Sequence, residues 1–149
     1  MSRLQQASYN IHCFKPGKEI FKTLKSNAPA DDRIKLNNFG LGKENCEAVL
    51  HYGERCDKCA SLTKRDLRHY GINTVNSESV QLTTLDDYCM AHGNEHILLL
   101  KLDIEGHELD ALQGSRKMIT ENRIDFANGN IPCDTFRLLD KDNGIQRGA

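Results

Sequence analysis

The feature that most constrains the fold is a nearly continuous apolar run at residues 97–102, Ile-Leu-Leu-Leu-Lys-Leu. A run of this length is typical of a central strand in a parallel sheet, where helices cover both faces. A helical pattern follows the run, with Leu109, Leu112 and Ile119 along one stripe. This order of a buried strand followed by an amphipathic helix predicts an α/β fold with a largely parallel sheet.

Strand and helix patterns alternate through the rest of the chain, which supports this fold class and a single domain over residues 1–149. We expect strands at residues 9–14, 33–39, 48–52, 79–82, 97–102 and 124–127. We expect helices at residues 18–26, at residues 84–92 with Thr84 as the N-cap, and after the 97–102 strand. Residues 40–42 predict a turn, and residues 53–76 predict a long polar excursion with a short helix near residues 64–69.

Charge and composition argue against several classes of protein. Lysine and arginine total 20 against 21 acidic residues, tryptophan is absent, and no basic patch interleaved with aromatic residues is visible. We therefore expect no nucleic-acid partner. No apolar segment approaches the ~18–20 residues that span a bilayer, and the N-terminus has no signal pattern. These features predict no membrane partner and a cytoplasmic location.

The six cysteines are expected to be reduced thiols in a chain of this length and location. Cys56 and Cys59 form a single C-x-x-C, which as a zinc half-site needs two further ligands from Cys46, His51 or His69. The simpler interpretation is two loop cysteines with no shared role, and we predict no metal.

The residues with the richest chemistry directly follow the apolar run, in the segment 101–108, Lys-Leu-Asp-Ile-Glu-Gly-His-Glu. Ligands of open α/β sheets bind beyond the carboxyl ends of the strands, and a helix N-terminus there adds N–H donors. Asp103 and Glu105 can accept protons or orient hydroxyls, and His107 can act as a general base.

Two other interpretations of this segment stay open on residue chemistry alone. In the first, Asp103 and Glu105 only cap the helix, while His107 and Glu108 face solvent. In the second, Asp103, Glu105 and His107 ligate a divalent ion, although their spacing matches no named metal motif. A similar choice exists at residues 86–87, Asp-Asp, where helix capping is favoured over a catalytic acid pair.

Residues 101–108 resemble the most distinctive motif of the FkbM-type S-adenosylmethionine-dependent methyltransferases. Further blocks resemble segments of this family in the family's order, at residues 11–16, 34–42, 61–62, 80–88 and 123–126. The resemblance spans residues 11–126 and leaves the tail at residues 127–149 unassigned.

The resemblance implies a Rossmann-like methyltransferase sheet and methyl transfer from S-adenosyl-L-methionine, usually to an oxygen of a small molecule or glycan. By position in the motif, Asp103 would lie at the methyl-transfer centre. Glu105 and His107 are then candidate acceptor-orienting or base groups. By the same resemblance, the cofactor's adenine would lie near Asn38, Phe39 and Gly40.

Two departures from the family pattern concern the cofactor. The family begins with a strand and a glycine-rich loop that cradle the cofactor, and nothing before Tyr9 resembles them. The family's second strand usually ends in an acidic residue that binds the cofactor ribose, and Lys15 stands there. A lysine cannot accept hydrogen bonds from the ribose hydroxyls. We therefore expect a partial methyltransferase domain that lacks the first strand and glycine-rich loop and binds the cofactor weakly.

Loss of a central strand would leave the edges of two neighbouring strands unpaired, which predicts reduced stability or self-association through exposed sheet edges. The alternative function is accordingly a truncated, non-catalytic methyltransferase-like protein that acts through protein–protein interaction.

Overall fold

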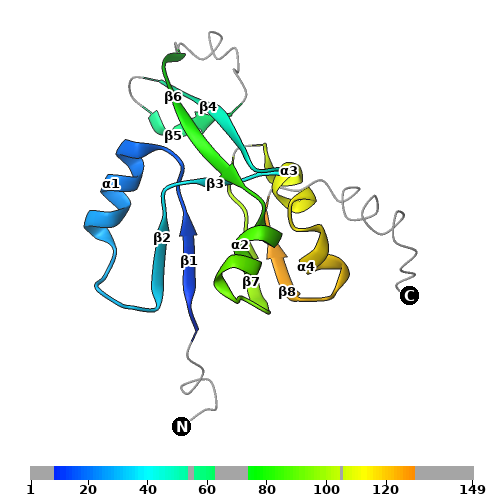
Figure 1. Ribbon diagram of the computed structural model, residues 1–149. Helices are drawn as coiled ribbons and strands as arrows, with labels where there is room; N and C mark the ends of the chain where they lie inside the picture. The colour runs from blue at the N-terminus through cyan, green and yellow to red at the C-terminus, as the bar shows by residue number, and fades with distance from the viewer. Residues whose placement is uncertain (1–8, 54–55, 63–73, 105, 130–149) are drawn as a thin grey trace.

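The computed structural model describes residues 9–53, 56–62, 74–104 and 106–129 (Figure 1). These residues form a mixed α/β structure, which confirms the expected class. The elements in chain order are β1 (Ile11–Phe14), α1 (Lys18–Asn27), β2 (Ile34–Asn37), β3 (Gly40–Leu41), β4 (Cys46–Gly53), β5 (Cys56–Ser61), β6 (Thr74–Thr83), α2 (Leu85–His92), β7 (Ile97–Lys101), α3 (Glu108–Gln113), α4 (Arg116–Thr120) and β8 (Ile124–Asn128).

The described strands form three sheets rather than one. β1 pairs with β2 and β7 pairs with β8, both in parallel register. The third sheet has the order β3-β6-β4-β5, and β4 runs antiparallel to both of its neighbours, so the expected mostly parallel sheet is only partly present. In Figure 1, β1 and β8 point the same way, toward the sheet that contains β4, β5 and β6. The carboxyl ends of the two parallel pairs therefore lie on the same side of the molecule.

The 97–102 strand differs from expectation in its surroundings. It forms β7, but within the described part of the chain β7 pairs with β8 alone. Leu98 is 43% exposed and Leu99 is 58% exposed, so the prediction of a central strand covered on both faces is wrong for these residues. Only the side chains that face the helices, such as that of Leu100, are buried.

The predicted turn at residues 40–42 is instead the short strand β3, which pairs in parallel with β6. A Cβ on Gly40 would lie 2.7 Å from Cδ2 of Leu82, so a side chain here would displace that of its register partner on β6. The polar excursion is also partly wrong, because residues 56–61 form β5 against β4, and β6 begins at Thr74. The helix predicted near residues 64–69 lies outside the described residues.

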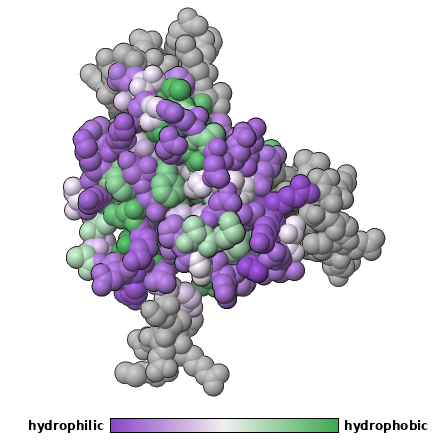
Figure 2. All heavy atoms as spheres, in the orientation of Figure 1, coloured by the Kyte–Doolittle hydropathy of each residue, from purple (hydrophilic) through white to green (hydrophobic). Residues whose placement is uncertain are grey.

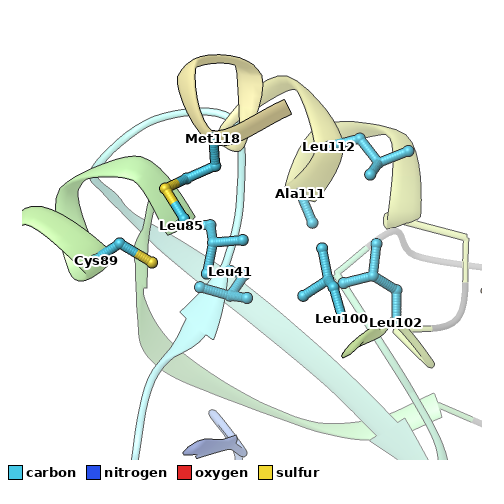
Figure 3. Packing of buried hydrophobic residues seen from close by; sticks show 8 residues of the cluster. All are labelled: Leu41, Leu85, Cys89, Leu100, Leu102, Ala111, Leu112 and Met118. Carbon is cyan, nitrogen blue, oxygen red and sulfur yellow. The ribbon is translucent and has the colours of Figure 1, made fainter. Parts of the chain in front are cut away.

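The hydrophobic core lies between one face of β7 and the helices α2, α3 and α4. Figure 3 shows its side chains pointing toward one another. The buried members are Leu41, Leu85, Cys89, Leu100, Leu102, Ala111, Leu112 and Met118. Because Leu100 and Leu102 flank the last residues of β7, this core fixes the position from which the 103–108 segment departs.

The single helix expected after residue 107 is two short helices, α3 and α4. The break falls at Gly114, whose added Cβ would lie 2.0 Å from the carbonyl oxygen of Gly42. The carboxylate of Asp86 accepts hydrogen bonds from the backbone N–H groups of Lys117 (2.8 Å) and Met118 (2.9 Å) at the start of α4. Asp86 therefore does cap a helix, but it caps α4 and not α2, the helix that it was expected to cap.

The N-terminus of α2 follows the sequence pattern closely. The Thr84 side chain accepts a hydrogen bond from the backbone N–H of Asp87 at 3.0 Å, which confirms Thr84 as the N-cap. The helix ends at Gly93, whose φ of 66° lies in the left-handed region that glycine adopts readily.

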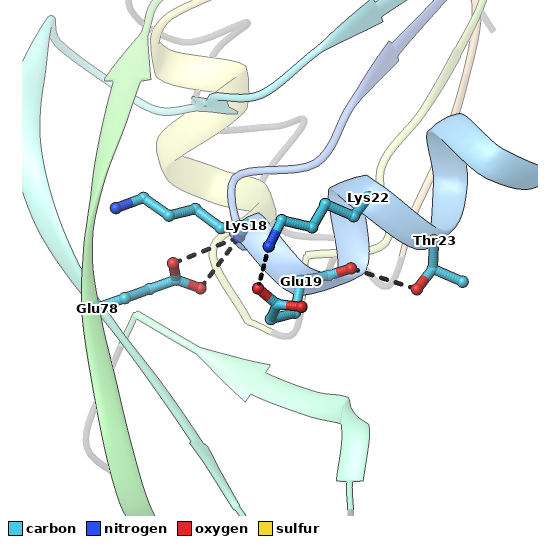
Figure 4. Close-up of polar contacts among 5 residues, drawn as sticks. All are labelled: Lys18, Glu19, Lys22, Thr23 and Glu78. Atoms are coloured by element: carbon cyan, nitrogen blue, oxygen red, sulfur yellow. Dashed lines mark hydrogen bonds and ion pairs between the residues drawn. The ribbon is translucent and has the colours of Figure 1, made fainter.

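The helix α1 lies on the surface with no buried residue. Figure 4 shows how its first turn is held: the carboxylate of Glu78 on β6 accepts from the backbone N–H of Lys18 at 3.2 Å. Within the helix, Lys22 Nζ donates to Glu19 Oε1 at 2.6 Å, with both side chains largely exposed. The lysines of α1 are thus a solvated face.

Figure 2 shows hydrophilic residues over most of one face of the molecule, with hydrophobic residues in patches among them. None of the helices in the described ranges is long and apolar enough to cross a membrane.

Candidate active site

The motif segment begins where β7 ends. The backbone N–H of Leu102 donates to the carbonyl oxygen of Asn128 at 2.7 Å, which ties the end of β7 to β8. Asp103 is exposed beyond this point, and the structure gives its carboxylate no hydrogen bond to another described residue. Gly106 has a φ of 97°, a conformation that L side chains rarely adopt, so the turn into α3 favours glycine. Glu105 lies outside the described residues.

Glu108 is the buried carboxylate of the motif, with a residue exposure of 5%. Its Oε1 accepts a hydrogen bond from the backbone N–H of Ile104 at 3.2 Å. The interpretation in which Glu108 faces solvent is therefore wrong. The side chain reaches back four residues and holds the turn between β7 and α3 in place, which a hydrophobic pattern alone does not reveal.

His107 is the N-cap residue of α3, and its side chain is only 17% exposed. The solvent-facing interpretation is wrong for this residue as well. Its Nδ1 lies 3.2 Å from Oδ2 of Asp110, one turn further along the chain. Sequence reasoning missed Asp110; the available signal was the i, i+3 spacing, which places the two side chains on one helix face.

His107 and Asp110 line a small pocket of about 60 Å³. Its other walls come from the β3–β4 connection and from β6, and they combine an apolar floor with a charged rim. These lining residues are Leu41, Gly42, Lys43, Glu44, Cys46, Leu62 and Leu82. The structure thus places a candidate base, with an adjacent carboxylate, beside a space that an acceptor group can enter.

A second, wider hollow of about 390 Å³ lies on the other side of Leu82, which lines both spaces. Its walls are Phe39, Gln81, Leu82, Thr83, Asp87, Tyr88, Ala91 and His92. Phe39, the residue expected near the cofactor adenine, is therefore at a hollow large enough for a ring system.

The other residues expected near the cofactor are close to Phe39 in the sequence or fold, but they differ in exposure and in whether their polar groups are already hydrogen-bonded. The Asn38 side-chain amide donates to the carbonyl oxygens of Lys15 (2.9 Å) and Pro16 (3.0 Å), and so ties the end of β1 to the end of β2. Lys15 is exposed at the carboxyl end of β1. Gly40 is buried within β3. The structure therefore gathers these residues at one end of the β1–β2 pair.

An aromatic cluster around Tyr88, which sequence reasoning also missed, underlies the wider hollow. The Tyr88 hydroxyl lies 2.7 Å from Nδ1 of His12 and accepts from Nδ2 of Asn37 at 3.2 Å. The Tyr88 ring stacks on His92 with ring centroids 4.1 Å apart, and it meets Phe14 edge-on at 4.8 Å. The contacts link α2 to β1 and β2.

Burial shifts the acid–base behaviour of this cluster. It raises the pKa of the Tyr88 hydroxyl, so this group stays protonated at neutral pH. Burial also lowers the pKa of His12, and the positive charges of His92 and Lys35 lower it further. A neutral His12 can accept a hydrogen bond from the Tyr88 hydroxyl at Nδ1, while Asn37 donates a hydrogen bond to the same hydroxyl oxygen.

The metal interpretations gain no geometric support where the chain is described. Among those residues, no group of three or more histidine, cysteine, aspartate or glutamate side chains could hold a metal ion. Glu105 and the side chains of Cys56, Cys59 and His69 lie outside the description, so both the divalent-ion interpretation and the zinc half-site stay untested. Cys46 is an exposed free thiol at the small pocket.

An α/β frame with an ionisable segment after a parallel strand, beside a pocket, is the arrangement of an α/β enzyme site. The sequence matches the family described as "Methyltransferase FkbM domain" over residues 5–131. This match covers most of the chain, and the protein therefore belongs to the FkbM methyltransferase domain family. The predicted family is confirmed.

Two known proteins are similar to this chain. The 2-O-methyltransferase NoeI of Sinorhizobium fredii (strain NBRC 101917 / NGR234) is 25% identical over 123 residues, which are 76% of this chain and 51% of NoeI. The chain therefore spans about half the length of this curated relative. The crystal structure of Methyltransferase FkbM from Methylobacillus flagellatus KT aligns with 91% of this chain and 29% of that chain, with 17% identity and a TM-score of 0.43.

Proposed function

We propose that this chain is part of an S-adenosylmethionine-dependent methyltransferase that methylates a hydroxyl oxygen of a small molecule or glycan. Membership of the FkbM family supports methyl transfer. The name of NoeI, a 2-O-methyltransferase, supports an oxygen acceptor. The observation that carries the proposal is the His107–Asp110 pair at the pocket that follows β7.

For this reaction the protein has to align the acceptor hydroxyl with the methyl group and accept the hydroxyl proton. S-adenosylmethionine, when bound, supplies a methyl group that is already activated on a sulfonium. His107 would accept the proton of the acceptor hydroxyl as that oxygen takes the methyl group in place of the sulfonium sulfur. Asp103, and by its place in the motif Glu105, would orient the acceptor hydroxyl.

The fit to the cofactor is uneven along its length. The hollow beside Phe39 has the volume of a ligand pocket and an aromatic wall, which suits the flat adenine ring. At the end of β1, Lys15 offers no lone pair to the ribose hydroxyls, and the amide of Asn38 already bonds two carbonyl oxygens. We therefore propose that a glycine-rich strand and loop of the family's kind complete the cradle from outside the described residues.

Calorimetric titration of the full chain with S-adenosylmethionine and S-adenosylhomocysteine tests the cofactor directly. Saturable binding at micromolar strength is the expected result if the adenine hollow dominates, and Phe39→Leu should then weaken binding about tenfold by removing the stacking ring. Met90→Leu, an exposed change on α2, is the matched control and should bind like the parent chain. No binding up to millimolar ligand would refute cofactor use by this polypeptide alone.

A second candidate function, interaction through sheet edges, is motivated by the strand pairing. Within the described ranges, β1 pairs only with β2 and β7 only with β8, so each has one edge without a strand partner. An unpaired edge offers a row of backbone donors and acceptors to another chain. We propose that these edges mediate self-association when no further strand fills them.

A further inference from the structure

The geometry of the first turn of α3 assigns a role to Asp110, a residue outside the family motif. We propose that Asp110 is a positioning residue that holds His107 in the tautomer protonated at Nδ1. This inference rests on the proposed function, because it makes His107 the base of that reaction. It adds a residue that acts through His107.

The argument begins with which atoms can donate. Oδ2 of Asp110 lies 3.2 Å from Nδ1 of His107. An ionised carboxylate only accepts hydrogen bonds, so a bond at this distance requires the proton to be on Nδ1. In the neutral imidazole the lone pair then belongs to Nε2, which is the nitrogen able to take a proton from an acceptor hydroxyl. Without a partner, an imidazole in water favours the other tautomer.

Burial distinguishes this pair from an ordinary surface contact. The His107 side chain is 17% exposed and that of Asp110 is 41% exposed. The carboxylate is therefore accessible to solvent, while the imidazole is mostly shielded from it. An i, i+3 pair of this kind contributes little to stability. Its physical consequence is the orientation and tautomer of an imidazole that lines the pocket.

The chain contains a matched control for this chemistry. His96 Nε2 lies 2.9 Å from Oδ1 of Asp125, but those side chains are 53% and 42% exposed and line neither of the two pockets. Here the carboxylate faces Nε2 and not Nδ1, so the same argument predicts that His96 is protonated at Nε2. A measurement that separates the two nitrogens therefore tests both pairs at once.

The experiment is nitrogen NMR of the full chain labelled with ¹⁵N in histidine, at a pH where the imidazoles are neutral. His107 should show a protonated Nδ1 and an unprotonated Nε2. Asp110→Asn should shift the His107 population by at least several-fold toward the form protonated at Nε2 and leave His96 unchanged. Asp125→Asn should leave His107 unchanged.

A parent chain in which His107 is mostly protonated at Nε2 would overturn the inference, as would an Asp110→Asn chain with the parent's His107 signals. Because the parent spectrum alone is decisive, the test survives a variant that does not fold. The measurement needs no cofactor. A missing calorimetric response to S-adenosylmethionine alongside an Nδ1-protonated His107 would therefore refute cofactor use by this polypeptide alone and retain the pair.

Discussion

At the scale of single residues, Tyr88 shows how one hydroxyl joins three elements. It receives a hydrogen bond from Asn37 on β2 and lies 2.7 Å from His12 on β1, while its own backbone belongs to α2. A neutral His12 can accept a hydrogen bond from this hydroxyl at Nδ1, whereas a protonated imidazole can only donate there and carries a charge that its part-buried surroundings, His92 and Lys35 disfavour. Protonation of His12 therefore works against the packing of α2 on the β1–β2 pair.

The surroundings of His12 predict a pH dependence of stability. The pKa of His12 is lowered from its ordinary 6.5 by burial, His92 and Lys35. Between the lowered value and 6.5 the unfolded chain binds more protons, so the free energy of unfolding falls as pH falls through that window and is fully regained above 6.5. Urea unfolding between pH 5 and 8 should show this slope, flattened in His12→Gln. The exposed His96→Gln is the control, and equal slopes in all three proteins would contradict the role of His12.

At the scale of elements, the link between α2 and α4 depends on one carboxylate. Asp86 sits in the first turn of α2 and accepts from two backbone N–H groups at the start of α4, those of Lys117 and Met118. No other described side chain caps α4. A helix of five residues has little stability of its own, so its cap and its buried Met118 hold it in place.

We therefore predict that Asp86→Ala lowers the free energy of unfolding by about 1–2 kcal/mol, the range measured for lost N-caps. Chemical denaturation with unchanged m-value is the measurement. Glu19→Ala in α1 is the control, since its ion pair with Lys22 is exposed and should contribute little to stability. If both variants lose the same stability, the capping contribution of Asp86 is refuted.

The same two elements show what the sequence could and could not predict. α2 was predictable because its N-cap and its terminal glycine are local signals. The break between α3 and α4 was not, since it depends on Gly114 meeting the backbone of Gly42, 72 residues earlier in the chain. β3 escaped prediction for a related reason: its two residues form a strand only where β6 is present.

In the candidate site as well, residues within a local sequence pattern were predictable and residues that depend on tertiary structure were not. His107 was identifiable because an ionisable residue follows an apolar strand, which is a local pattern. Asp110 and the buried Glu108 were not, because their importance depends on where α3 turns after Gly106. The Tyr88 cluster joins positions from three separate elements, and no pattern within any one of them reveals it.

At the scale of the whole molecule, the pairing of strands is the feature that departs most from a stable parallel sheet. Parallel sheets are normally buried on both faces, yet β1–β2 and β7–β8 are separate pairs in the described structure. Large apolar side chains are exposed on these strands: Ile11 (53%) on β1, Leu99 (58%) on β7 and Phe126 (64%) on β8. Leu99 and Phe126 are register partners, so their side chains share one face of the β7–β8 pair.

These features predict that the isolated chain self-associates. Joining such edges and faces between copies removes apolar surface from water, at about 25 cal/mol per Å², and pairs the open backbone groups. Sedimentation velocity over a hundredfold range of concentration should show a growing dimer or larger species. Leu99→Lys should shift the chain toward monomer, because a charge on an exposed strand opposes both burial and strand addition. Met90→Lys, at the 73% exposed Met90 of α2, adds the same charge away from the strands and should associate like the parent.

A parent chain that stays monodisperse as a monomer, with a high melting temperature, would show that the open edges are already satisfied within one polypeptide. That outcome would refute association and direct attention to the residues beyond the described ranges as the partners of these edges.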